Sequence, residues 1–170
     1  MIPASIDEKS IRNNNLKKRA EKIARTKAEK VAAENKGVII SCDTFSSCEG
    51  EVLEKPKNIA EAKKMLRFLS GKKATNYTGF CYIDSSKRIN FSKTVVVTYE
   101  IRKLYAHEID SYVNDFPVTE WAAGFALVYP YITSFITKIN GSYTGLSYGL
   151  PTELLVPLLK RSGFEPKPQM

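Results

Sequence analysis

Two long runs of β-forming residues, Thr75–Ile83 and Ile89–Ile101, constrain the fold of this chain most strongly. Both are rich in β-branched and aromatic side chains, which favour strands. The polar residues between them, Asp84 to Arg88, are typical of a hairpin loop. A chain of 170 residues is expected to form one domain or two intimately packed lobes around such strands.

Helical and strand patterns alternate on either side of this hairpin. Apolar steps of three and four residues predict a helix over about residues 16–35, and shorter helices are predicted over 58–69, 106–114 and 152–159. Val38–Cys42 is typical of a strand buried on both faces that ends at Asp43, and residues 51–54 predict a short return strand. This order predicts an α/β fold with a mixed twisted sheet, packed helices and two lobes around a cleft.

The charge balance indicates an anionic partner. The chain has 26 Lys and Arg against 18 Asp and Glu, which gives a formal charge of +8. No apolar run approaches the roughly 18 residues of a membrane span, and the N-terminus does not resemble a signal peptide. The three cysteines are odd in number and contain no CxxC pair, which favours a cytoplasmic protein without disulfides or a zinc site.

Several single residues argue against particular kinds of catalytic or binding site. His107 is the only histidine and lies at a predicted helix start, so Ser-His-Asp and Cys-His triads are not expected. Cys42 lies in a predicted buried strand without a nearby histidine and is interpreted as a structural thiol. The tyrosines and phenylalanines of residues 129–143 could stack on a base, but without an RNA-binding pattern core packing or a lobe interface is the preferred interpretation.

Three residues, Asp43, Lys55 and Lys27, together favour a site that acts on a phosphate ester. Asp43 follows a buried strand, where ligands bind in many α/β sheets, and Lys55 is held extended by the proline after it. Lys27 lies close to the apolar stripe of its helix, so it either faces a cleft or extends past small residues to water. Asp7 and Glu8 could hold a hard divalent cation through their oxygens. Such a set suits hydrolysis of a phosphate ester, although the chain has no Walker or GxGxxG motif.

Nearly the whole chain, from about Ile6 to Gly163, resembles the Maf family of nucleoside triphosphate pyrophosphatases. No single motif carries the resemblance, which depends on the order and spacing of many short segments. These are Ile6-Asp-Glu8, Ile23-Ala-x-x-Lys-Ala28, Asp43-Thr44, Val52-Leu-Glu-Lys-Pro56, Ala60-Glu-Ala-x-x-Met-Leu-x-x-Leu-Ser-Gly71, Thr78, Val96-x-Thr98, Glu108-Ile-x-x-Tyr-Val113, Ala123-Gly124, Ile139-x-Gly-Ser-Tyr143 and Gly149-Leu-Pro151.

The resemblance implies a fold like that of inosine triphosphate pyrophosphatase and hydrolysis of a noncanonical or modified nucleoside triphosphate to the monophosphate and pyrophosphate. It implies Mg²⁺ or Mn²⁺ as cofactor. Asp43 would be the proton acceptor that activates water, Lys27 and Lys55 would bind phosphate, and Asp7 with Glu8 would lie near the metal. Thr44 and Tyr129 fall at positions linked to base selection. Family members often pair, so a homodimer stays open, and a cytoplasmic location is expected.

Two departures from the family pattern qualify these implications. Family members begin with a buried strand and a Ser-x-Ser-Pro-Arg-Arg loop, and the chain starts just before Asp7, so we expect one domain over residues 1–170 that is shorter than the family at its N-terminus. Either the coding start lies upstream or this form has lost catalysis. Tyr129 stands where glutamine is usual in the pyrimidine-preferring subfamily, so pyrimidine specificity is not transferred.

Three hypotheses therefore stand after the sequence. The first is a metal-dependent nucleotide pyrophosphatase, and the second is a nucleotide-binding or regulatory protein of the same fold without catalysis. The third, a basic RNA-binding domain, is least favoured, because basic residues are interleaved with acids and no RNA-binding motif is present. Neither a nucleic acid nor a membrane is the expected partner.

Overall fold

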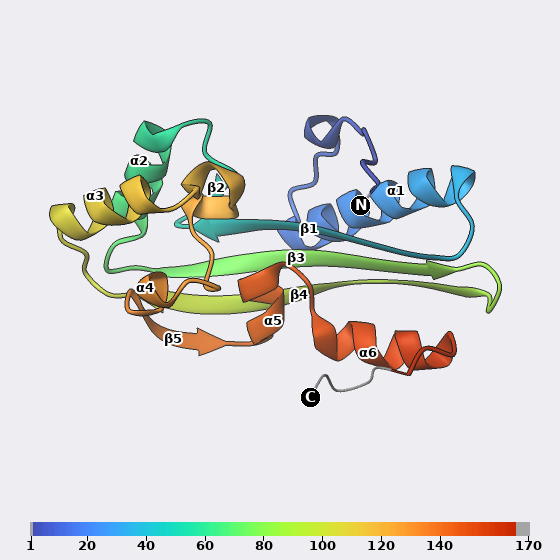
Figure 1. Ribbon diagram of the computed structural model, residues 1–170. Coiled ribbons are helices and arrows are strands. Elements are labelled where there is room, and N and C mark those ends of the chain that lie inside the picture. Colours follow the sequence, from blue (N-terminus) through green and yellow to red (C-terminus); the bar gives the residue numbers. More distant parts are fainter. Residues whose placement is uncertain (1, 166–170) are drawn as a thin grey trace.

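The computed structural model describes residues 2–165 and confirms an α/β fold built on a five-stranded sheet of order β2-β1-β3-β4-β5 (Figure 1). The strands are β1 (Val38–Cys48), β2 (Glu51–Leu53), β3 (Lys73–Asp84), β4 (Ile89–Ile101) and β5 (Ile136–Asn140). The helices are α1 (Leu16–Glu34), α2 (Ile59–Leu69), α3 (Ala106–Asp115), α4 (Pro130–Thr133), α5 (Tyr143–Tyr148) and α6 (Thr152–Arg161). Three 3₁₀ turns are η1 (Glu8–Ser10), η2 (Val118–Glu120) and η3 (Ala122–Gly124).

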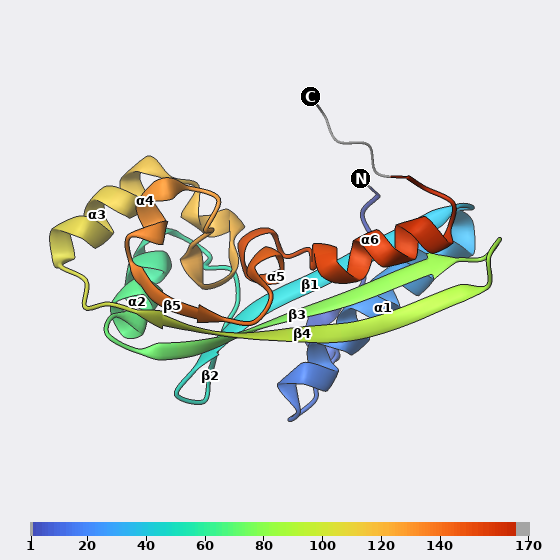
Figure 2. The ribbon, with the colours of Figure 1, turned by 90° about the horizontal axis from the view of Figure 1, so that it is seen from below.

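The predicted hairpin is the long β3–β4 pair, which runs in continuous antiparallel register from Lys73 opposite Glu100 to Asp84 opposite Ile89 (Figure 2). Every strand pair within residues 2–165 is antiparallel, so the sheet there is not mixed in strand direction. For two of the four pairs the physical reason lies in the connections: tight turns join β1 to β2 and β3 to β4, and such turns can only link antiparallel strands.

Strand β1 differs from its prediction in two ways. It does not end at Asp43 but continues to Cys48, because its antiparallel pairing with β3 extends from Val38 to Ser47. The residues Val38–Cys42 are not buried on both faces, and Ile40 is 41% exposed. Strand β2 pairs only with Ser46–Cys48, so the first part of β1 is an edge of the sheet. Asp43 therefore lies within a strand.

Helix α1 packs on one face of the sheet through the apolar stripe that the sequence predicts. Its buried residues are Ala20, Ile23, Ala24 and Ala28, and Asn15 caps its first turn by accepting a hydrogen bond from the backbone N–H of Lys18. Helix α6 covers the opposite face of the same part of the sheet (Figures 1 and 2). The largest core cluster lies at the other end, where α2 and α3 pack on the sheet.

A glycine sets the distance between α1 and the sheet. Gly79 lies directly opposite Asp43 in the register of β1 and β3. A Cβ atom at this position would lie 2.0 Å from the backbone oxygen of Ala20 on α1. The missing side chain allows the helix backbone to touch the strand, which keeps α1 close enough for its side chains to reach β1.

We expect Gly79→Ala to destabilise the protein by about 1–3 kcal/mol or more, because the added methyl group overlaps backbone atoms that can yield only if α1 moves. Urea unfolding followed by circular dichroism measures this change. Thr75→Ala, on the same strand, adds no volume and is the control. An unchanged unfolding midpoint for Gly79→Ala would show that α1 does not approach β3 this closely.

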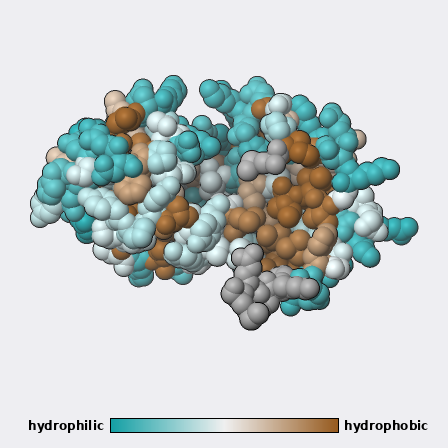
Figure 3. Space-filling model, in the orientation of Figure 1, coloured by the Kyte–Doolittle hydropathy of each residue, from teal (hydrophilic) through white to brown (hydrophobic). Residues whose placement is uncertain are grey.

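Two lobes lie above the sheet in the view of Figure 1, one formed by α1 with the N-terminal segment and the other by β2, α2 and α3. The surface is hollowed between them (Figure 3). Within the described residues, no helix is both long and apolar enough to cross a membrane. The single-domain prediction for residues 1–170 also includes residues 1 and 166–170, which lie outside the described residues.

Candidate functional site

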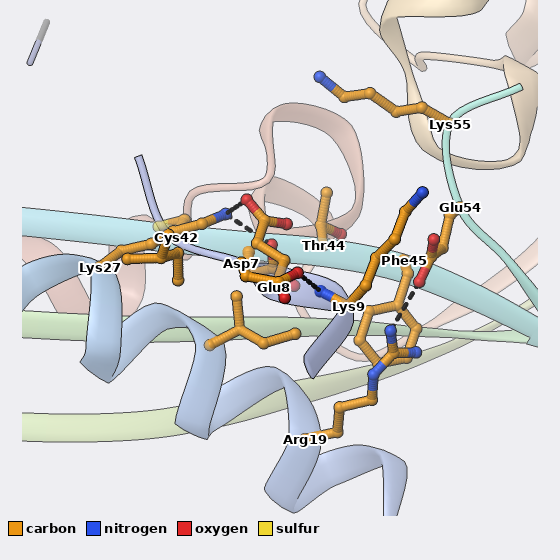
Figure 4. A pocket seen from close by; sticks show the side chains of 13 residues that line it. Asp7, Glu8, Lys9, Arg19, Lys27, Cys42, Thr44, Phe45, Glu54 and Lys55 are labelled. Atoms are coloured by element: carbon orange, nitrogen blue, oxygen red, sulfur yellow. Dashed lines mark hydrogen bonds and ion pairs between the residues drawn. The ribbon is translucent and has the colours of Figure 1, made fainter. Parts of the chain in front are cut away.

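A cavity of about 580 Å³ lies between the two lobes, against β1 (Figure 4). It combines side chains from the N-terminal segment, from α1, from β1 and from the loop after β2. Six of the seven site residues predicted from the sequence line it: Asp7, Glu8, Lys27, Asp43, Thr44 and Lys55. The remaining lining residues are Ile6, Lys9, Arg19, Ile23, Cys42, Phe45 and Glu54.

Lys27 lines this cavity and bridges two carboxylates. Its Nζ lies 2.8 Å from Oδ1 of Asp43 and 2.9 Å from Oε1 of Glu8. The side chains of Lys27 and Asp43 are only 20% and 11% exposed, whereas that of Glu8 is 49% exposed. Lys27 therefore faces inward and does not extend past its small neighbours to water, which decides between the two readings of its helix position.

The environment raises the pKa of both Asp43 and Lys27. Burial raises the pKa of Asp43 above its ordinary value, and the hydrogen bond from Lys27 opposes this shift without cancelling it. Burial lowers the pKa of Lys27, but its hydrogen bonds to Asp43 and Glu8 more than compensate, so its pKa is raised. Two carboxylates share one ammonium, and the triad carries a net negative charge that attracts protons and other cations.

Arg19 forms a second ion pair at the edge of the cavity. Its Nη2 lies 2.7 Å from Oε1 of Glu54, and its guanidinium lies 5.0 Å from the ring centroid of Phe45. Arg19 is held by α1 and Glu54 follows β2, so this pair joins the two lobes (Figure 4). Lys9 and Lys55 are exposed, and within the described residues neither side chain takes part in an ion pair.

The donor set fits a magnesium-type cation that completes its coordination with substrate. Among the described residues, no group of three or more His, Cys, Asp or Glu side chains could hold a metal alone. Asp7 and Glu8 are adjacent carboxylates in the lining, and Glu8 pairs with Lys27 through Oε1, so its other oxygen lies outside that ion pair. Mg²⁺ is commonly bound by one or two carboxylates together with water and phosphate oxygens. Asp7 lines the cavity, while its carboxylate accepts a hydrogen bond from the backbone N–H of Lys9.

A second cavity of about 390 Å³ adjoins the first and shares Thr44 and Lys55 with it. Its wall is largely apolar and aromatic, with Trp121 and Phe125 on one side and Tyr148 on another. Six polar side chains also line it, and such a mixture of apolar wall and a few polar groups suits a flat organic group; these are Thr44, Ser46, Lys55, Asn76, Glu120 and Ser147. The arrangement places an apolar cavity directly beside a charged one.

Tyr129 is the predicted site residue that the structure does not bring to either cavity. Its ring packs against Phe116 at 4.8 Å and against Trp121 at 5.1 Å between ring centroids. This placement agrees with the core-packing alternative for the aromatic residues of this region. Its neighbour Val128 lines the second cavity instead.

Sequence reasoning missed Arg19, Glu54 and Asn76, all of which line the cavities. Arg19 lies eight residues before Lys27 on the same helix, which was an available signal, but nothing local marks Asn76 on β3. Burial raises the pKa of Cys42 to about 12, so this thiol stays protonated, in keeping with a structural role. His107 is exposed at the start of α3.

Comparison with known proteins finds one matching family model and several similar sequences. A family model described as Maf-like protein matches residues 1–162. A dTTP/UTP pyrophosphatase of Pyrococcus abyssi (strain GE5 / Orsay) is 35% identical over 172 residues, covering 99% of this chain and 88% of that protein. Proteins with the same name from Pyrococcus horikoshii and Chelativorans sp. (strain BNC1) are 33% and 30% identical, covering 98% and 97% of this chain and 87% and 81% of their own length.

Proposed function

Because the chain belongs to the Maf-like protein family, we propose that it hydrolyses a nucleoside triphosphate to the nucleoside monophosphate and pyrophosphate. The observation that carries the proposal is the Glu8–Lys27–Asp43 triad beside an apolar cavity. The charged cavity suits the phosphates, and the apolar cavity suits the nucleoside. Thr44 and Lys55 line both cavities, where the α-phosphate would join the two parts of the substrate.

In this mechanism Asp43 is the general base. It accepts a proton from a water molecule whose oxygen attacks the α-phosphorus, and the bond from that phosphorus to the bridging oxygen breaks to release pyrophosphate. A base is most effective when its pKa lies near the working pH, and burial moves the pKa of Asp43 in that direction. Lys27 keeps this carboxylate oriented through the 2.8 Å ion pair.

The cations of the cavity would bind the phosphates. An ammonium has three N–H donors, and Lys27 uses two of them on Asp43 and Glu8, so one remains for a phosphate oxygen. Lys9 and Lys55 are exposed in the same cavity and can reach a triphosphate by side-chain rotation. Arg19 is paired with Glu54 and would contribute through the donors that this pair leaves open.

A divalent cation, Mg²⁺ or Mn²⁺, is part of the proposal. The lining has four basic side chains, Lys9, Arg19, Lys27 and Lys55, and four acidic ones, Asp7, Glu8, Asp43 and Glu54. A triphosphate therefore enters a cavity with no surplus of positive charge. Glu8, with Asp7 beside it in the lining, would hold the cation, which when bound neutralises phosphate oxygens and stabilises the negative charge that develops on them.

The test is a panel of canonical and modified nucleoside triphosphates incubated with Mg²⁺ or Mn²⁺ in water enriched in ¹⁸O. We expect pyrophosphate release from at least one of them, with the label in the nucleoside monophosphate, because water attacks the α-phosphorus. Label in released orthophosphate would contradict the proposal. Binding of a nucleotide in calorimetry without turnover would favour the binding or regulatory alternative.

A further inference from the structure

A third cavity, of about 460 Å³, adjoins the charged cavity that contains Lys27. It lies where the N-terminal segment meets the start of α1 and the residues of β2. Lys9, Arg19 and Glu54 line both this cavity and the charged one. Among the described residues, no side chain lines both the third cavity and the apolar one. The charged cavity therefore lies between the other two.

The third cavity is the positive member of this series. Within the part of the chain that the structure describes, its lining has one acidic side chain, Glu54, against three basic ones, Lys9, Arg12 and Arg19. The 2.7 Å ion pair with Arg19 neutralises Glu54. Lys9 and Arg12 are exposed, and neither forms an ion pair within residues 2–165. Two positive charges are thus left over here, whereas the charged cavity has as many acids as bases.

The local structure holds this lining together. Ile11, in the segment that carries both unpaired cations, is only 9% exposed, and its backbone oxygen accepts a hydrogen bond from Nε of Arg19 at 3.4 Å. This contact ties the N-terminal segment to α1. Asn13 also lines the cavity, and its side-chain oxygen accepts from the backbone N–H of Asn15 at 2.8 Å. The amide N–H groups of Asn13 are left for an anionic ligand.

The geometry of phosphoryl transfer directs the leaving group toward this cavity. The attacking and leaving oxygens lie roughly in line across the phosphorus. The proposed base, Asp43, is paired with Lys27, which lies on one side of Thr44 in the view of Figure 4. Lys9 and Arg19 lie on the other side of Thr44 in that view. With the α-phosphate beside Thr44, pyrophosphate would leave away from Asp43 and toward the positive cavity.

We propose that Lys9, Arg12 and Arg19 form a subsite that binds the terminal phosphates of the substrate and then the departing pyrophosphate. This inference rests on the proposed function for the identity of its ligand, and the chemistry that the subsite recognises is a polyphosphate. Arg12 distinguishes it, because this residue lines the third cavity and not the charged one. A guanidinium can bind a phosphate through two parallel N–H···O bonds.

The first experiment titrates inorganic pyrophosphate, without divalent cations, into the intact chain and three variants by calorimetry. Arg12→Gln should weaken binding about 10-fold, the low end for a charge-assisted hydrogen bond, because the side chain is exposed. Glu54→Gln should strengthen binding about 3-fold, because it removes the acid but keeps an oxygen that can accept from Arg19. Lys18→Gln is the matched control: Lys18 is exposed on α1 and is absent from the described linings of the three cavities, so the affinity should not change.

A competition experiment identifies which phosphates the subsite holds. Pyrophosphate should give no binding heat once the chain is saturated with an α,β-methylene nucleoside triphosphate, whose P–C–P link cannot be hydrolysed. Binding that persists would place the anion at a separate site and overturn the assignment to terminal phosphates. Equal affinities for pyrophosphate in the intact chain and in Arg12→Gln would overturn it too, as would no binding by the intact chain.

Kinetics separates this binding role from a role in the chemical step. Arg12→Gln should raise KM for the triphosphate about 10-fold and leave kcat nearly unchanged, because the terminal phosphate makes the same contact before and during bond breaking. A fall in kcat at constant KM would contradict the inference. If the intact chain turns over no triphosphate, the proposed function fails, while the pyrophosphate titrations still decide whether the subsite exists.

Discussion

Asp43→Asn should lower kcat by about 10²- to 10⁴-fold, the usual contribution of a general base, with little change in KM. The amide has nearly the same shape as the carboxylate but cannot accept a proton from water. The measurement is steady-state release of pyrophosphate from the best substrate of the panel.

In the unmodified chain, activity should fall as the pH drops through the pKa of Asp43, and because burial raises that pKa, the acid limb should lie above the value of about 3.9 expected for an ordinary aspartate.

The same substitution should leave the protein folded. Because the pKa of Asp43 is raised in the folded state, its ionised form costs stability above that pKa, and this cost disappears when the group is protonated or replaced by an amide. Lys27 retains Glu8 as a partner in the variant. Asp115→Asn, an exposed aspartate at the end of α3, is the control and should change neither activity nor melting temperature. Full activity in Asp43→Asn would exclude Asp43 as the base.

Lys27→Met should lower kcat/KM by about 10²-fold or more. The substitution removes charge-assisted hydrogen bonds that are each worth roughly 1.5–3 kcal/mol, and each 1.36 kcal/mol corresponds to a factor of ten in rate. It also changes the pH profile. Lys27 lowers the pKa of Asp43 against the effect of burial, so its loss lets that pKa rise and the acid limb should move to higher pH.

The shift of the acid limb separates a role in the site from a role in folding, because partial unfolding lowers activity without moving it. Lys22→Met is the matched control: Lys22 is exposed on the same helix, and within the described residues its side chain makes no ion pair. It should keep the activity and pH profile of the unmodified chain. A profile for Lys27→Met with an unmoved acid limb would show that Lys27 does not act on Asp43.

The sequence by itself determined the elements whose signals are local. The apolar spacing of residues 16–35 predicted α1 and placed Lys27 near its inner face, and the β-rich runs predicted the β3–β4 hairpin. Six of the seven predicted site residues line one cavity. The order and spacing of short motifs along the chain were enough to identify these six positions. Strand β1 was predicted too short, because the polar residues after Cys42 resemble a strand end, although pairing with β3 keeps them extended.

Only the tertiary structure decided which side chains meet. Two contacts join residues more than thirty positions apart: the ion pair of Arg19 with Glu54 and the hydrogen bond from Asn76 to Thr44. Periodicity along the chain therefore could not predict them. Packing against Phe116 and Trp121 kept Tyr129 out of both cavities. The charge of a residue can be read from the sequence, but its partner depends on register and helix packing, and the partner decides whether Lys27 is a free cation or the centre of a triad.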